Sequence, residues 1–167
     1  MDEGRMTGRS RTGAEVEELV ARVRDAAGSS YTWRRHANGF DLTTEVPQAT
    51  RRLTRQHTYE VALQPEANTF TLTDVVRIER QGPGGTWSKS VQRGRLRYRS
   101  VATAADGSGR RSFNSADGHR LIRDVTEELG WREVASRTER AGRFAGFLGG
   151  GIAAATLIAM AVVLLVR

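Results

Sequence analysis

The sequence predicts an α+β fold: a two-layer sandwich of one antiparallel sheet with two helices, followed by one C-terminal transmembrane helix. Three observations predict it. Amphipathic helical patterns lie near both ends of residues 13–131, alternating apolar patterns for about five or six strands lie between them, and residues 145–166 carry no charge. Two apolar helix stripes that match one apolar sheet face are typical of two packed layers.

Composition restricts the chemistry more than the function. The 167 residues carry a net charge of +7 and no cysteine, and Lys89 is the single lysine among 26 basic residues. The lack of cysteine excludes disulfides, thiolate catalysis and thiolate metal sites. A basic surface attracts anionic lipid, nucleic acid or an acidic protein, and charge alone does not choose between them. We interpret the preference for arginine as a sign of a GC-rich bacterial genome.

The first elements are a leader and a helix. Residues 1–12 are polar, glycine-rich and aperiodic, which predicts disorder. A helix then begins with a capping box formed by Thr12 and Glu15, and Gly28 ends it. Its apolar residues recur at helical spacing and form one stripe, Val16, Leu19, Val20 and Val23. We expect this stripe to face the core.

A β-hairpin follows the helix. Asn38-Gly39 lies between two alternating runs and predicts a two-residue turn in which both residues take positive φ. Pairing around this turn places Trp33 opposite Thr44 and His36 opposite Asp41. One face of the pair is mainly apolar and the other polar, as in a sheet that is covered on one side.

Two further strands are predicted at residues 59–63 and 70–78, joined by a turn at 65–68. Asp74 falls on the apolar face of the second. We considered three explanations: a buried functional carboxylate, a bulge near Val75, and a pair with an arginine. The sequence does not decide between them.

The predicted domain ends with two strands and a helix. A fifth strand covers residues 91–103, and a short sixth near 111–114 pairs back onto it. Asp117 is the predicted cap of the second helix, and Gly130 ends it. The apolar positions of this helix again form one stripe, Leu121, Ile122, Val125 and Leu129.

Alternating arginines form the most specific chemical pattern, at Arg93, Arg95, Arg97 and Arg99. Side chains alternate along a strand, so one continuous strand would present all four guanidinium groups on one face. Such a row could bind the phosphates of anionic lipid or nucleic acid, or an acidic protein segment. The alternative is a solvated strand face whose charges pair with neighbouring carboxylates and protect a sheet edge from aggregation.

The C-terminal residues 145–166 predict a membrane anchor. As a helix they would be about 33 Å long, enough to cross a hydrocarbon core of about 30 Å. A basic juxtamembrane linker or helix at 132–144 precedes the anchor, and several arginines on this side face only Arg167 on the other. The positive-inside rule then predicts a single-pass protein of the cell membrane with a cytoplasmic N-terminal domain.

The anchor carries a stripe of small residues, Gly142, Gly146, Gly150 and Ala154. Small residues at this spacing let two helices approach closely, so a homo-oligomer through the anchor is one interpretation. The other is that glycine and alanine are simply common in membrane helices.

The sequence therefore favours a membrane-anchored, non-enzymatic protein whose basic domain binds a protein partner or anionic lipid at the inner membrane surface. An alternative is a ligand-binding or catalytic domain with a pocket between sheet and helices, using Asp74 or Arg35 as buried polar groups. Nucleic-acid binding ranks third because the aromatic residues fall on core positions. No motif for catalysis, a metal or a cofactor is present.

Overall fold

A computed structural model of the chain describes residues 10–50, 52–103 and 109–136. Every element below lies within the first of the two units into which the chain divides, Met1–Val134. In chain order these elements are α1 (Gly13–Ala27), η1 (Gly28–Ser30), β1 (Thr32–His36), β2 (Gly39–Glu45), β3 (Leu53–Gln64), η2 (Pro65–Ala67), β4 (Thr69–Gln81), η3 (Pro83–Gly85), β5 (Trp87–Gly94), β6 (Arg99–Thr103), β7 (Arg110–Asn114), α2 (Ser115–Glu128) and β8 (Arg132–Glu133).

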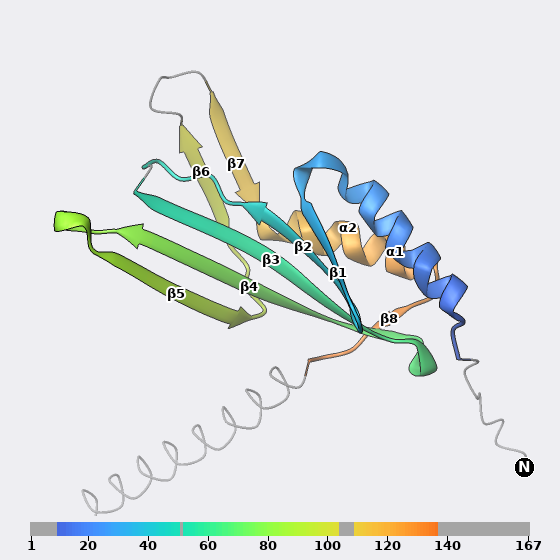
Figure 1. Ribbon diagram of the computed structural model, residues 1–167. Helices are drawn as coiled ribbons and strands as arrows, with labels where there is room; N and C mark the ends of the chain where they lie inside the picture. Colours follow the sequence, from blue (N-terminus) through green and yellow to red (C-terminus); the bar gives the residue numbers. More distant parts are fainter. Residues whose placement is uncertain (1–9, 51, 104–108, 137–167) are drawn as a thin grey trace, which may run out of the picture. The chain divides into compact units, whose positions relative to one another are not determined.

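The main sheet runs in the order β1-β2-β3-β4-β5, with every neighbouring pair antiparallel (Figure 1). Strand β8 pairs in parallel with the start of β4, and β6 and β7 form a separate antiparallel pair. The predicted α+β class is confirmed. Residues 132 and 133, predicted to lie in a linker, instead form β8.

Helix α1 forms where its capping signals predicted. The side chain of Thr12 accepts from the N–H of Glu15 at 3.3 Å, and the Glu15 carboxylate accepts from the Thr12 N–H at 2.7 Å. These bonds satisfy backbone donors that a helix start leaves unpaired. Gly28 ends the helix with φ 53°, a backbone conformation that glycine adopts without a steric penalty.

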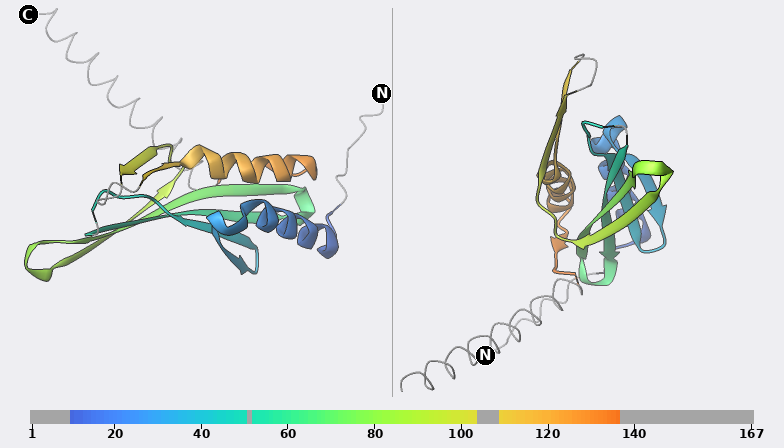
Figure 2. Two further views of the ribbon diagram at one scale, coloured as in Figure 1. Left: turned by 90° about the horizontal axis from the view of Figure 1, so that it is seen from above. Right: turned by 90° about the vertical axis from the view of Figure 1, so that its left-hand side faces the viewer.

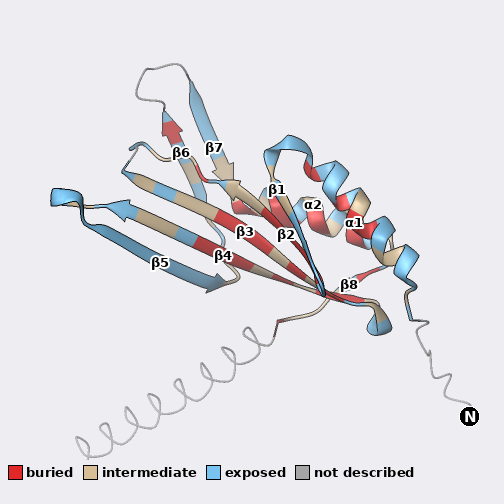
Figure 3. Cartoon of the chain, in the orientation of Figure 1, coloured by how far each residue is buried: buried red, intermediate tan, exposed pale blue. Residues whose placement is uncertain are grey.

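One core joins the two helices to the covered face of the sheet. Buried residues lie along α1, α2 and the strands β2 to β4, as Figure 3 shows. Trp131 folds back into the same core and is 5 % exposed, with the guanidinium of Arg11 over its ring. The main contributors from both layers are Leu19, Val23, Phe40, Leu42, Tyr59, Val61, Phe70, Leu72 and Ile122.

The first hairpin forms with a register different from the predicted one. Trp33 lies opposite Leu42, and Asp41 lies opposite Arg34 rather than His36. The turn residues are Ala37 and Asn38, neither of which has positive φ. Neighbouring β3 explains the shift. A Cβ at residue 39 would lie 1.9 Å from a β3 carbonyl oxygen, so this glycine is needed within the strand and not at the turn.

Strands β3 and β4 confirm the next prediction. They pair along twelve positions around a turn in which Asn68 has φ 51°. Asp74 lies directly opposite Tyr59 in regular register, so no bulge at Val75 explains its position. It is 1 % exposed on the covered face.

The predicted strand over residues 91–103 is wrong, because the chain leaves the sheet at Gly94. This residue has φ 139° and ends β5, and residues 95–98 have no regular secondary structure before β6 begins. The Leu96 N–H donates to the Asp74 carboxylate at 2.7 Å. A buried acceptor therefore takes a backbone donor that a continuous strand could have used for pairing.

Helix α2 begins earlier than predicted. Asn114, not Asp117, is its N-cap, and the Asn114 side chain accepts from the Ala116 N–H at 3.1 Å. Within α2, Gly118 lies against the ring of Tyr59, where a Cβ would lie 2.3 Å from a ring carbon. Close packing of α2 on β3 therefore depends on this glycine.

Several predictions fall on residues that the structure does not describe. They concern residues 1–9 of the leader, 137–144 of the linker and the anchor at 145–166, with the stripe of Gly142, Gly146, Gly150 and Ala154. Within the described ranges, no helix is both long and apolar enough to span a membrane.

Candidate functional site: a basic hairpin above a buried His-Asp-His cluster

The four alternating arginines occupy three different structural settings. Arg93 lies in β5, Arg95 and Arg97 lie in the connecting segment, and Arg99 begins β6. They therefore do not share one strand face. The physical reason is the break at Gly94, after which strand alternation no longer sets side-chain direction.

The first two arginines form ion pairs with carboxylates. The Arg93 guanidinium contacts Glu60, its neighbour across the open face of the sheet. Arg95 and Arg123 both contact Glu133. Burial opposes the ionisation of this carboxyl, but hydrogen bonds from the two arginines lower the pKa of Glu133 below its usual value. Arg93 and Arg95 therefore have carboxylate partners, as the alternative explanation expected.

The second half of the pattern has different surroundings. Arg97 and Arg99 are exposed, and so are Arg110 and Arg111 on β7, which lie opposite Thr103 and Ala102 of β6. None of these four makes an ion pair within residues 10–50, 52–103 and 109–136. We call β6, β7 and Arg97 the basic hairpin. The described part of this hairpin contains no carboxylate.

The two faces of the basic hairpin differ. Arg99, Val101 and Thr103 share one face with the β7 residues Arg110 and Ser112, and all five are exposed. Val101 is 45 % exposed, which is high for a valine. This face therefore presents cationic groups around an apolar side chain. The opposite face includes Ala102, which is buried, Phe113, and Arg111, which pairs with Ala102.

A buried polar cluster lies at the base of the basic hairpin. Nε2 of His119 lies 2.7 Å and Nε2 of His57 lies 3.1 Å from the same carboxylate oxygen of Asp74. The second carboxylate oxygen accepts the Leu96 N–H. Burial raises the pKa of a carboxyl group, but these hydrogen bonds outweigh it and lower the pKa of Asp74 to about 2.

Tyr98 connects this cluster to the basic hairpin. Its hydroxyl lies 3.0 Å from Nδ1 of His57, and its ring packs 5.4 Å from Phe113 of β7. The Tyr98 backbone bonds Ser115 twice, through its N–H at 3.0 Å and its carbonyl at 3.1 Å. Burial raises the pKa of Tyr98 to about 12, although the nearby guanidinium of Arg55 opposes the shift.

The cluster is enclosed, and we interpret its role as positioning. His57, Asp74 and His119 are exposed by only 0 %, 1 % and 3 %. No group of three His, Asp or Glu side chains in the described ranges has the geometry of a metal site. What the cluster does is tie β3, β4, the segment after Gly94 and α2 together through one ionised carboxylate. The base of the basic hairpin is thereby fixed on the sheet.

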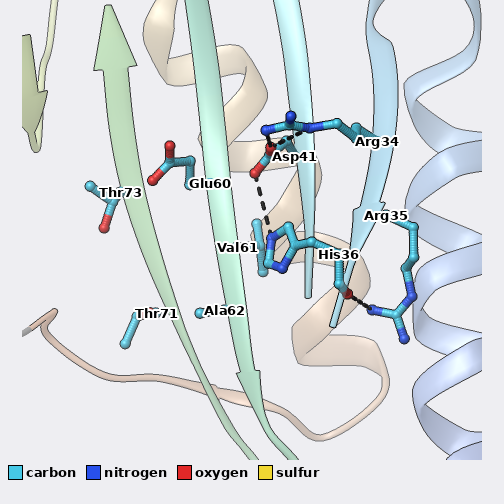
Figure 4. A pocket seen from close by; sticks show the side chains of 9 residues that line it. All are labelled: Arg34, Arg35, His36, Asp41, Glu60, Val61, Ala62, Thr71 and Thr73. Atoms are coloured by element: carbon cyan, nitrogen blue, oxygen red, sulfur yellow. Dashed lines mark hydrogen bonds and ion pairs between the residues drawn. The ribbon is translucent and has the colours of Figure 1, made fainter. Parts of the chain in front are cut away.

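A hollow of about 370 Å³ lies on the open face of the sheet, opposite the helices (Figure 4). Two rows of residues that lie opposite one another across β1 to β4 form it. Gly39 and Ala62 in one row are too small to fill the space. The polar side chains around it are Arg34, His36, Asp41, Glu60, Thr71 and Thr73.

The charges of this hollow are already paired. Arg34 contacts Asp41 at 2.5 Å, His36 lies 3.5 Å from the same carboxylate, and Glu60 contacts Arg93. Arg35 points to the helix side and pairs with Glu17 at 2.8 Å, with its side chain 35 % exposed. It is therefore not the buried polar group that the alternative prediction used. Asp74 is buried as predicted, but its partners are histidines and not an arginine.

Sequence reasoning missed two parts of this arrangement. Arg110 and Arg111 begin β7, and only the β6–β7 pairing places them on the same hairpin as Arg99, opposite Thr103 and Ala102. The partners of Asp74 come from three distant places in the chain, with His119 separated from it by 45 residues. Comparison with known protein families, curated proteins and solved structures found no match to this chain.

Proposed function

We propose that this protein is a membrane-anchored binding protein whose basic hairpin contacts anionic phospholipid headgroups at the inner membrane surface. The observation that carries the proposal is the group of four exposed arginines without a carboxylate partner in the described ranges, Arg97, Arg99, Arg110 and Arg111. The proposed role is binding without catalysis or a cofactor.

The arginine chemistry favours phosphate. A guanidinium group donates two parallel hydrogen bonds to phosphate oxygens, and each basic residue near an anionic leaflet contributes about 1 kcal/mol. The exposed Val101 can enter the headgroup region beside the arginines. In this proposal residues 145–166 cross the membrane once, with the domain on the cytoplasmic side. Such a tether raises the local concentration of headgroups, so weak contacts suffice.

Lipid fits this surface better than nucleic acid does. Proteins that bind single-stranded nucleic acid stack bases on aromatic side chains beside the basic groups. Here Tyr98 and Phe113 pack against His57 at the base of the basic hairpin instead of standing on its exposed face. An acidic protein partner would use the same charges without the membrane, and the experiment below separates it from lipid.

The test uses the full chain in lipid nanodiscs with a fluorophore on Ser112→Cys, which is the only thiol because the sequence has no cysteine. A spin label on the lipid headgroup quenches the fluorophore when the basic hairpin approaches the bilayer. We expect strong quenching when phosphatidylglycerol is added to a zwitterionic bilayer, and loss of quenching at high salt because exposed charges are screened.

Matched variants identify the surface. Arg99→Gln with Arg110→Gln should abolish the effect of phosphatidylglycerol. Arg24→Gln with Arg120→Gln removes the same charge from exposed helix positions and should leave quenching unchanged. Equal quenching in zwitterionic and anionic bilayers would contradict the proposal and leave an acidic protein as the partner to seek.

The proposed topology needs its own measurement. A protease added to intact cells should leave the domain uncut, and lysis should expose it. Digestion in intact cells would place the domain outside and exclude an inner-surface role.

A further inference from the structure

Strand β5 is an edge of the main sheet with an unusual surface. It pairs with β4 on one side, and no strand in the described ranges pairs with its other side. Its first seven residues, from Trp87 to Arg93, are all exposed. The β4–β5 hairpin extends past the helices (Figure 2), so neither helix covers this edge. An exposed edge leaves backbone N–H and C=O groups available to a further strand.

The open face of β5 alternates apolar and cationic side chains. Directly paired residues lie on the same face of a sheet. Arg93 pairs with Val75, whose side chain is on the open face, so every second residue of β5 lies on that face. This face carries Trp87, Lys89, Val91 and Arg93. Trp87 and Val91 are 63 % and 59 % exposed, more than Val101 at 45 %. The opposite face carries Ser88, Ser90 and Gln92.

This pattern is complementary to itself in one antiparallel register. With Ser90 opposite Ser90 of a second copy, Trp87 lies opposite the partner's Arg93, and Lys89 lies opposite the partner's Val91. Each cation then faces an apolar side chain, which allows an aromatic–cation contact and packing against a lysine stem. Seven positions of the eight-residue strand pair.

Only one other register pairs as many residues while keeping like faces together. In this register Val91 lies opposite Val91 of the second copy, and Lys89 lies opposite the partner's Arg93. Two cations directly opposite each other destabilise a strand pair. The other edge, β1, has only five residues and includes consecutive arginines at 34 and 35. Pairing of β1 with itself around its centre would place Arg34 opposite Arg34.

We propose that two copies of this chain associate through antiparallel pairing of β5 with β5, centred on Ser90, to form one continuous sheet across the dimer. The pairing covers both of the highly exposed apolar residues of β5. It uses no residue of the basic hairpin, so it stands or fails independently of lipid binding. A dimer through residues 145–166 alone would be a different contact.

The first test uses full-length protein in membranes with one introduced cysteine, which is again the only thiol. Paired residues at the centre have Cα atoms about 5 Å apart, within disulfide range. Ser88 lies on the same face, but Ser88 and Ser88 of the partner would be about 14 Å apart along the strands. Mild oxidation should therefore link Ser90→Cys into a covalent dimer and leave Ser88→Cys monomeric.

A second variant tests the same contact without a disulfide. Val91→Lys places a new cation opposite the partner's Lys89 at two symmetric positions, so the dimer mass of the uncrosslinked protein in detergent should fall to that of a monomer. Val101→Lys makes the same substitution at an exposed valine of β6 and should leave the dimer intact.

Three results would overturn the proposal. They are equal oxidation of Ser88→Cys and Ser90→Cys, a dimer that persists in Val91→Lys, and a wild-type protein that is monomeric in detergent and gives no Ser90→Cys crosslink in membranes. A dimer that survives Val91→Lys would assign the contact to another surface of the chain.

Discussion

The β4–β5 hairpin and the basic hairpin both carry arginines of one alternating pattern, yet their electrostatic surroundings differ. On β5, Lys89 contacts Glu79 and Arg93 contacts Glu60. On the basic hairpin, Arg99 and Arg110 have no carboxylate partner in the described ranges. The difference shows that alternation in sequence does not by itself make a binding surface. Whether a cation already has a carboxylate partner depends on the neighbouring strand.

The separation of the two hairpins depends on what lies between them. Gly94 ends one strand, and the next residues turn toward the buried carboxylate of Asp74, which holds the Leu96 N–H. Tyr98 is then fixed by His57 and Ser115 before β6 begins. The buried cluster is therefore the structural reason that one half of the pattern lies on the sheet and the other on a separate hairpin.

The largest expected effect comes from removing the centre of the cluster. Asp74→Ala leaves two buried histidines and the Leu96 N–H without their acceptor, so we expect a loss of about 3 kcal/mol in the free energy of unfolding. Urea unfolding of the full chain in detergent, followed by tryptophan fluorescence, measures it. Asp25→Ala, at a side chain that is 75 % exposed, is the control and should change little. A loss below about 1 kcal/mol would show that the cluster does not hold the hairpins apart.

A second effect is on pH dependence. The pKa of Asp74 is lowered from 3.8 to about 2, so its ionised form stabilises the folded state at pH values above about 4. This contribution, about 2 kcal/mol, is lost as pH falls from about 4 to about 2. Unfolding free energies of wild type and Asp74→Asn should therefore converge over this interval. A constant difference between them down to pH 2 would contradict the assignment.

A smaller effect is expected at the break itself. Gly94→Ala introduces a Cβ at φ 139° and should cost about 1 kcal/mol through backbone strain, since no atom crowds the site. Gly109→Ala has neither strain nor crowding and is the matched control. Thermal unfolding compares the two. Equal stability of both variants would mean that backbone strain at Gly94 does not enforce the break.

Local signals in the sequence predicted the elements whose causes are local. The capping box of Thr12 and Glu15, the helix stop at Gly28 and the turn containing Asn68 form as expected. The first hairpin was shifted because contact with β3, which is far away in sequence, requires Gly39 inside the strand. Turn chemistry alone did not contain that information.

The candidate site was less predictable for the same reason. Asp74 was recognised as an unusual charge on an apolar face, but its histidine partners come from β3 and α2 and have no sequence pattern that links them. Arg97 and Arg99 were singled out from the sequence as cationic residues, and both are exposed. Arg110 and Arg111 join the same hairpin, opposite Thr103 and Ala102, only through the pairing of β6 with β7.

The most direct test of the account compares two arginines of the basic hairpin with two paired cations of β5, with equal changes in charge. In nanodiscs with phosphatidylglycerol, headgroup quenching of the fluorophore at Ser112→Cys is measured for Arg97→Gln with Arg99→Gln and for Lys89→Gln with Arg93→Gln. The account predicts that the first pair lowers the ratio of docked to undocked hairpin roughly 30-fold, at about 1 kcal/mol per arginine, and that the second pair changes it little. Equal losses from both pairs would show that net charge alone drives the contact, and would contradict a specific role for the basic hairpin.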